Sequence, residues 1–151
     1  MIWGVLQFPG SCDERDALNA CTIASGGFGG HAKLVWHEET DLSGFDGIVV
    51  PGGFSYGDYL RAGAIARFAP AMGAVADFAA AGGPVLGICN GFQVLCESGL
   101  LPGALLTNES TRFICRQGDL IVQESDSMFL SGYEAGERIS IPFKHQSGRF
   151  F

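Results

Sequence analysis

Cys89 is flanked by Gly87 and Gly91, after a short apolar run and before a stretch with helical spacing. A cysteine there could fill core space, hold a metal ion, form a disulfide or attack a substrate as a nucleophile. A glycine two residues away on each side is typical of a nucleophile elbow, a strand-to-helix turn so sharp that nearby side chains would clash. The positive end of the following helix also favours the thiolate over the thiol. The pattern therefore favours a nucleophile over a core cysteine.

A thiolate that attacks a carbonyl group needs two backbone N–H donors for the oxygen that becomes negatively charged. The residue after the elbow, Asn90, is expected to supply one of them. The other would come from a glycine-rich turn at the end of a neighbouring strand, and Pro51-Gly52-Gly53 follows such a strand. By itself this tripeptide fits an ordinary turn, but together with an elbow it indicates an oxyanion site.

The thiol also needs a base, and the chain has three histidines. His31, expected in the turn before the second strand, and His37, among acidic residues after it, are interpreted as surface residues. His145 ends a late strand of alternating apolar residues and follows the nucleophile in the chain, which is the order found in nucleophile-elbow enzymes. Taken alone, His145 fits a structural role as well as a base.

The composition limits the class of protein. With 151 residues, of which 47% are hydrophobic and 17% charged, we expect one domain over residues 1–151 with a substantial core. A formal net charge of −7 with no basic face argues against nucleic-acid binding. No apolar run reaches the roughly 18 residues of a membrane span, and the start lacks the basic lead of a signal peptide. Five scattered cysteines without a CxxC pair argue against a disulfide framework and favour the cytoplasm as the location. Three scattered histidines without ligand spacing argue against a zinc site.

The elements expected to position these residues alternate between short apolar strands and helices. Strands are expected at 1–8, 31–37, 44–53 and 84–88, and helices at 11–27, 62–83 and 91–99, with Pro70 kinking or splitting the second helix. Continuously apolar strands followed by helices predict an α/β fold with a mostly parallel, flavodoxin-like doubly wound sheet. After residue 112, two strands around Gln117-Gly118 and a third at 137–145 predict an antiparallel flap or edge.

Three stretches of the sequence closely resemble one family. They are QFPGSCDERDA near the start, VVPGGFSYGDYLRAGAIARF at 49–68, and GPVLGICNGFQVLCESGLLPGALLTNESTRFICR at 83–116. They are similar to the glutaminase subunits of phosphoribosylformylglycinamidine synthases, which belong to the class I, or triad-type, glutamine amidotransferases. The resemblance covers nearly the whole chain, from Trp3 to about Phe151.

The resemblance implies that Cys89 attacks the side-chain amide of glutamine, forms a γ-glutamyl thioester and releases ammonia. His145 would match the family's catalytic histidine in a PxxHxEG segment. Gly53 and Asn90 would donate their amides to the oxyanion. The positions implied for the glutamine site as a whole are Gly52, Gly53, Phe54, Asn90 and Gln93. Asn108 and Arg112 lie in a segment that resembles the family's glutamine-pocket strand, but they fit a surface turn equally well.

The resemblance also implies partners. Ammonia would pass to a synthetase subunit that uses ATP and Mg to convert formylglycinamide ribonucleotide into the amidine, a step of purine synthesis. A small accessory subunit would complete the complex. No cofactor is expected in this chain itself, which has no P-loop.

Two features depart from the family pattern. The family has a carboxylate two residues after the histidine, where this chain has Ser147, and it continues well past residue 151. The expected domain therefore lacks the family's C-terminal segment, and Glu124 and Glu137 are candidate replacements for the missing carboxylate. Two alternatives stay open: a catalytically impaired structural subunit of the same complex, and an elbow-cysteine protein of the redox or chaperone type.

Overall fold

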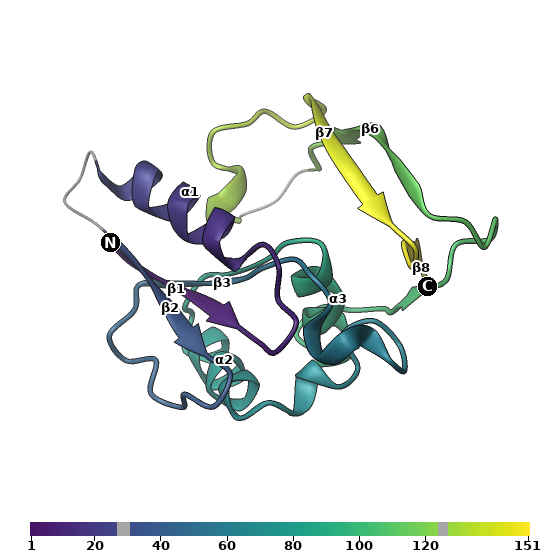
Figure 1. Cartoon of the computed structure of the whole chain (residues 1–151). Coiled ribbons are helices and arrows are strands. Elements are labelled where there is room, and N and C mark those ends of the chain that lie inside the picture. Colours follow the sequence, from purple (N-terminus) through teal and green to yellow (C-terminus); the bar gives the residue numbers. More distant parts are fainter. Residues whose placement is uncertain (27–30, 124–126) are drawn as a thin grey trace. The chain divides into compact units, whose positions relative to one another are not determined.

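A computed structural model describes residues 1–26, 31–123 and 127–151 (Figure 1). Within these ranges the chain forms two compact units. The first comprises residues 1–106 with 149–151, and the second comprises residues 107–148. Glu124, one candidate for the missing carboxylate, lies outside the described residues.

The first unit is built on a four-stranded parallel sheet. Its strands are β1 (Ile2–Gln7), β2 (His31–Trp36), β3 (Gly47–Val50) and β4 (Val85–Gly87), in the order β2-β1-β3-β4. Val5 pairs with Leu34 on one side and with Val49 on the other, and Val49 pairs with Leu86. The predicted flavodoxin-like fold is confirmed, and the carboxyl ends of β3 and β4, where ligands bind in such sheets, lie side by side.

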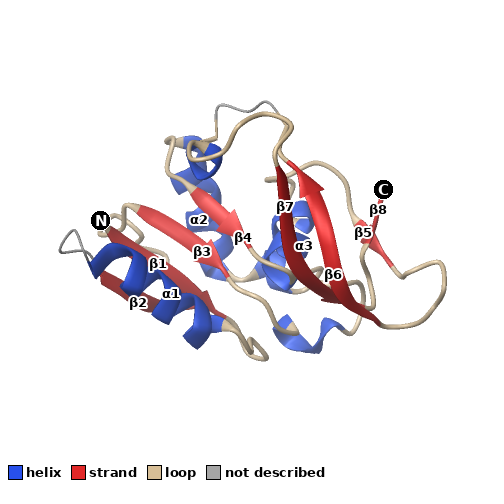
Figure 2. Ribbon diagram, turned by 90° about the horizontal axis from the view of Figure 1, so that it is seen from above, coloured by secondary structure: helices blue, strands red, loops and turns tan. Residues whose placement is uncertain are grey.

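Helices cover both faces of this sheet. Helix α1 (Glu14–Gly26) lies on one face, while α2 (Pro70–Ala80) and α3 (Asn90–Glu97) lie on the other (Figures 1 and 2). The core beneath α2 and α3 includes Leu6, Ile48, Val50, Met72, Val75, Val94 and Leu95. All four residues of β3 are buried, as expected of a central strand covered on both sides. None of the helices in the described ranges has both the length and the apolar character that membrane crossing requires.

Pro70 splits the helix predicted over residues 62–83. A short 3-10 turn, η2 (Ala66–Phe68), comes first, and α2 then begins at Pro70. Proline is favoured at the first position of a helix because its missing N–H would have no partner there. Ala69 is correspondingly extended, and Gly82, in a left-handed conformation, follows the end of the helix.

The second unit contains an antiparallel pair, β6 (Ile114–Ile121) and β7 (Arg138–His145). The prediction of two strands around Gln117-Gly118 is wrong, because β6 runs through both residues without a turn. A side chain at Gly118 would meet the ring of Phe143 on β7, with Cδ1 at 2.7 Å from an added Cβ. The glycine therefore makes room for an aromatic side chain of the partner strand rather than for a turn.

Two further short strands, β5 (Leu105–Leu106) and β8 (Arg149–Phe150), pair within the first unit.

This packing predicts that Gly118→Val destabilises the second unit by about 1–3 kcal/mol, the usual cost of overpacking. Gly132→Val in the same unit is the matched control, since nothing lies within 4 Å of an added Cβ there. Urea unfolding followed by circular dichroism measures both changes. Equal stability of the two variants would contradict the role of Gly118 as a contact site for Phe143.

Candidate active site at the nucleophile elbow

Cys89 joins β4 to α3 with backbone angles of φ 52° and ψ −109°. A positive φ is unfavourable for a residue with a side chain, and such strain persists only where the surroundings enforce it. Both flanking glycines are needed. An added Cβ at Gly91 would overlap the carbonyl oxygen of Val50, and one at Gly87 would lie 2.8 Å from the backbone nitrogen of Phe92. The turn presents an exposed thiol at the start of a helix.

The glycine-rich turn after β3 lies beside this thiol. An added Cβ at Gly52 would lie 3.4 Å from Cβ of Cys89, and it would also overlap the carboxylate of Asp13. Gly53 has φ +135°, and a side chain there would press on the backbone nitrogen of Cys12. The structure thus brings Gly52 next to Cys89, and only glycine fits this approach of three chain segments.

Phe54 and Gln93 differ in how they relate to the elbow. The backbone N–H of Phe54 donates to the carbonyl of Gly10 (3.0 Å), and its side chain is 61% exposed. The Gln93 side chain is half-buried on the first turn of α3, and its Oε1 accepts a hydrogen bond from Nδ2 of Asn90 (3.0 Å). The main chain of Phe54 therefore stabilises the loop after β3, whereas Gln93 lies at the start of the helix that carries the nucleophile and contacts Asn90 there.

The Asn90 side chain, which is 3% exposed, connects α3 to the 3-10 turn η1 (Ser55–Asp58). Its Oδ1 accepts from the backbone N–H and the hydroxyl of Ser55, at 3.1 and 2.7 Å. Its Nδ2 donates to Asp58 at 3.0 Å. The sequence prediction concerned only the backbone amide of Asn90. The side chain is a buried connection that fixes the residue next to Cys89.

The turn η1 is itself strained. Tyr56 and Asp58 have φ values of 53° and 49°, and Gly57 between them has φ 76°. The Tyr56 hydroxyl lies 2.7 Å from Nδ1 of His37. His37 is half-buried and is thus less exposed than a free surface residue, while His31 is exposed and is the first residue of β2. The consecutive left-handed residues Tyr56, Gly57 and Asp58 need contacts with residues outside η1 to hold their conformation.

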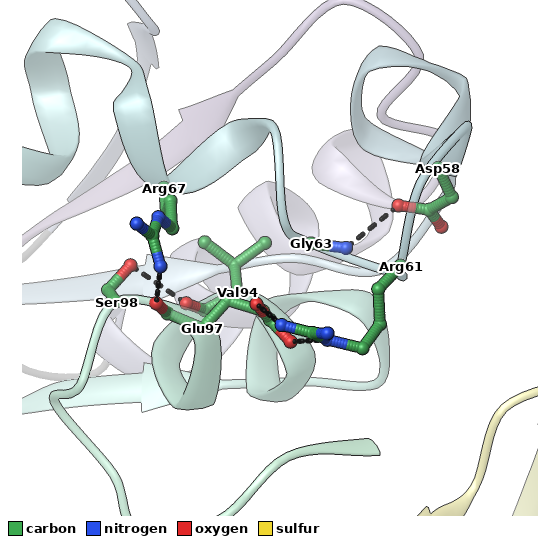
Figure 3. Close-up of polar contacts among 7 residues, drawn as sticks. All are labelled: Asp58, Arg61, Gly63, Arg67, Val94, Glu97 and Ser98. Atoms are coloured by element: carbon green, nitrogen blue, oxygen red, sulfur yellow. Dashed lines mark hydrogen bonds and ion pairs between the residues drawn. The ribbon is translucent and has the colours of Figure 1, made fainter. Parts of the chain in front are cut away.

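Helix α3 provides some of the contacts that hold η1 and the loop after it (Figure 3). The guanidinium of Arg61 binds both carboxylate oxygens of Glu97, with Nη2 to Oε2 at 2.7 Å. The Glu97 side chain is only 3% exposed, and the hydrogen-bonded Arg61 holds the pKa of its carboxyl below the ordinary value. Arg67 donates to the backbone carbonyl of Glu97 at 3.2 Å. The backbone N–H of Gly63 donates to Asp58 at 2.9 Å.

Sequence reasoning missed the roles of Ser55, Asp58, Arg61 and Glu97. One signal was available for Glu97, which ends an otherwise apolar helical stretch. A negative charge is unfavourable at the C-terminal end of a helix, so an acid there indicates a cationic partner. Nothing in the sequence indicates that the partner is Arg61.

His145 lies at the end of β7 in the second unit. Its Nδ1 is 2.9 Å from Oδ1 of Asn108, whose amide group donates to the carbonyls of Arg112 (2.8 Å) and His145 (3.0 Å). The backbone N–H of Gly148 also donates to Oδ1 of Asn108 (3.0 Å), and the imidazole stacks on Phe143. Asn108 is 5% exposed and thus buried, whereas Arg112 is exposed. The surface-turn interpretation is therefore wrong for Asn108, whereas both interpretations stay open for Arg112.

Glu137 does not replace the missing carboxylate. It precedes the first residue of β7, whereas His145 is the last, and a strand rises about 3.3 Å per residue. The two side chains are therefore more than about 20 Å apart along the strand. Within the described ranges, no group of three or more His, Cys, Asp or Glu residues could hold a metal ion.

Comparisons with known proteins agree on one family. A family model described as a CobB/CobQ-like glutamine amidotransferase domain matches residues 3–151. Phosphoribosylformylglycinamidine synthase subunit PurQ of Rhodococcus jostii is 56% identical over 147 residues, which make up 97% of this chain and 64% of the relative. The subunit of the same name from a Synechococcus strain is 51% identical over 148 residues, 98% and 64% of the respective chains. The chain thus spans about two thirds of the length of these relatives.

A solved structure has the same fold. The structure of PurLQS from Thermotoga maritima contains a chain that matches with a TM-score of 0.91 and 43% identity. The match covers 99% of this chain and 68% of that one.

The elbow geometry predicts opposite effects for two helical glycines. Gly91→Ala should destabilise the first unit by about 1–3 kcal/mol, because its Cβ would overlap a backbone oxygen that cannot rotate away. Gly73→Ala in α2 has nothing within 4 Å of its Cβ and should stabilise by about 1 kcal/mol through helix propensity. Urea unfolding compares the two variants. A Gly91→Ala protein as stable as the parent would show that the turn is looser than described.

Proposed function

Because the chain belongs to the family of CobB/CobQ-like glutamine amidotransferase domains, we propose that it hydrolyses glutamine as part of a phosphoribosylformylglycinamidine synthase. The reaction would supply ammonia for the conversion of formylglycinamide ribonucleotide to formylglycinamidine ribonucleotide in purine biosynthesis. The curated relatives carry the name of a subunit of that synthase.

In the proposed reaction, Sγ of Cys89 forms a bond to the side-chain amide carbon of glutamine. The carbonyl oxygen becomes an oxyanion, and the backbone N–H groups of Asn90 and Gly53 donate to it. Collapse of this intermediate breaks the carbon–nitrogen bond, and the nitrogen takes up the proton released by the thiol, carried by His145, and leaves as ammonia. Water then adds to the γ-glutamyl thioester and gives up a proton, the carbon–sulfur bond breaks, and that proton returns to sulfur as glutamate leaves.

One observation carries this proposal: the strained backbone of Cys89, which places an exposed thiol at the start of α3 with Gly52 beside it. The first N–H groups of a helix have no partner within the helix, and they attract negative charge. The same feature favours a thiolate before the reaction and an oxyanion during it. A cysteine that only filled the core would need neither exposure nor a positive φ.

The proposal includes a synthetase partner that uses ATP and Mg, together with a small accessory subunit, and it assigns no cofactor to this chain. It places the protein in the cytoplasm. The observation behind this placement is the pattern of five scattered cysteines without a CxxC pair.

A chloroketone analogue of glutamine is expected to alkylate Cys89 much faster than Cys12 or Cys115, although all three thiols are exposed. Burial raises the pKa of the Cys21 and Cys96 thiols, which should react slowest. Mass mapping of the labelled peptides, with and without glutamine as a competitor, measures the preference. Iodoacetamide, which does not resemble glutamine, is the control reagent. Equal labelling of the three exposed thiols by the analogue would contradict the proposal.

The proton-transfer role of His145 stays a prediction, and His145→Gln tests it. Steady-state ammonia release in the presence of a synthetase subunit should fall, while labelling of Cys89 by the analogue should persist. Unchanged ammonia release would place the general base elsewhere. Labelling and turnover together also separate an active glutaminase from an impaired structural subunit, which would be labelled without turning glutamine over.

A further inference from the structure

We propose that Glu97, through its ion pair with Arg61, is a positioning residue for the nucleophile: the pair fixes the loop 55–63 on α3, and this loop fixes Asn90. The inference rests on the proposed function, because its consequence is the reactivity of Cys89 toward glutamine. Glu97 itself would not touch the substrate.

Glu97 is a costly residue at its position. It ends α3, where the helix dipole disfavours a negative charge, and its side chain is 3% exposed. A buried carboxylate needs a charged partner with good hydrogen-bond geometry. Arg61 provides this through two parallel hydrogen bonds, the strongest arrangement for a guanidinium and a carboxylate. Separating the loop from the helix would leave that charge buried, so the pair holds the two segments together.

The contact between loop and helix continues from Glu97 back to the nucleophile. An added Cβ at Gly63 would lie 2.7 Å from the backbone nitrogen of Val94, so the two main chains touch in the middle of α3. Gly63 donates to Asp58, and Asp58 accepts from the Asn90 side chain. The loop therefore binds the end, the middle and the start of the helix, and its last contact is the residue after Cys89.

The conformation of the loop explains why the pair matters for chemistry. Tyr56 and Asp58 both adopt left-handed conformations that are unfavourable for residues with side chains. Loss of the Arg61–Glu97 pair allows this strain to relax, and Asp58 and Ser55 then no longer hold the Asn90 side chain in one place. Asn90 supplies the proposed oxyanion N–H. A small shift there therefore slows a reagent whose carbonyl group must bind in the glutamine site, such as the chloroketone analogue, more than a reagent that does not bind there, such as iodoacetamide.

The test compares Glu97→Gln with Asp46→Asn. Each change neutralises one carboxylate that accepts a hydrogen bond, but Asp46 precedes β3, at the opposite end of that strand from the loop, and binds the backbone N–H of Ile2 (2.7 Å). For Glu97→Gln, the limiting rate at which the chloroketone analogue labels Cys89 should fall about tenfold, within the range for residues in coupled networks. The rate with iodoacetamide should stay within about twofold, whereas Asp46→Asn should leave both rates at the parental value.

Arg61→Ala and Arg61→Lys give independent readouts. The Arg61 side chain is 49% exposed, so its loss opens no cavity in the core, and Arg61→Ala removes the partner of the buried Glu97 charge. If the pair acts as a unit, Arg61→Ala combined with Glu97→Gln should lose no more reactivity than either change alone. Arg61→Lys keeps the charge without the two-pronged geometry and should be intermediate. A Glu97→Gln protein with a lower melting temperature but the parental labelling rate would overturn the inference, as would strictly additive effects of the two changes.

Hydrogen exchange separates this inference from the proposed function. The amides of Ser55 and Gly63 donate to Asn90 and Asp58, and they should exchange faster in Arg61→Ala than in the parent. If these amides exchange faster in Arg61→Ala but the analogue never labels Cys89, the result would support the coupling between the Arg61–Glu97 pair and Asn90 and refute the glutaminase proposal. Unchanged exchange would refute this coupling even if labelling proceeds.

Discussion

The left-handed backbone at Cys89 is the constraint on which the site depends. A chain that leaves β4 and enters α3 with only two residues between them must bring the first turn of the helix against the end of β3, and Gly91 then touches the Val50 carbonyl. This contact leaves no room for a side chain, and it fixes the height of the helix above the sheet. The position of the thiol relative to Gly52 follows from that height. Geometry of this kind is set by the fold before any substrate binds.

Most of the remaining structure around the elbow serves to keep that turn in place. The loop after β3 is strained at Tyr56 and Asp58, yet it is held by a buried asparagine at one end and by a buried glutamate at the other. Neither polar group would be stable in the core without the loop, and the loop would not keep its conformation without them. The strained loop and the buried polar side chains therefore stabilise one another in a single arrangement. In this arrangement the helix that carries the nucleophile cannot shift along the sheet.

The parts of this structure that could be predicted from the sequence are those that depend on local pattern. Apolar runs ended by glycines indicated the strands, and the two glycines around Cys89 indicated the elbow, because both signals lie within a few residues. The error at Gln117-Gly118 arose because a glycine that admits the Phe143 ring has the same local appearance as a turn glycine. Asn90, Glu97 and Asn108 bind Asp58, Arg61 and His145, which lie 32, 36 and 37 residues away, and no local pattern names these partners.

The hydrogen bonds of Asn108 also determine the tautomer of His145. The Gly148 N–H can only donate, so the amide atom that it shares with His145 is an acceptor oxygen, and the amide nitrogen donates to two carbonyls. His145 Nδ1 must therefore carry a hydrogen in the neutral ring, and any further proton can bind only at Nε2. The contact between Asn108 and His145 is consequently the same in the neutral and the charged imidazole, and this turn can keep its shape while His145 changes its protonation state.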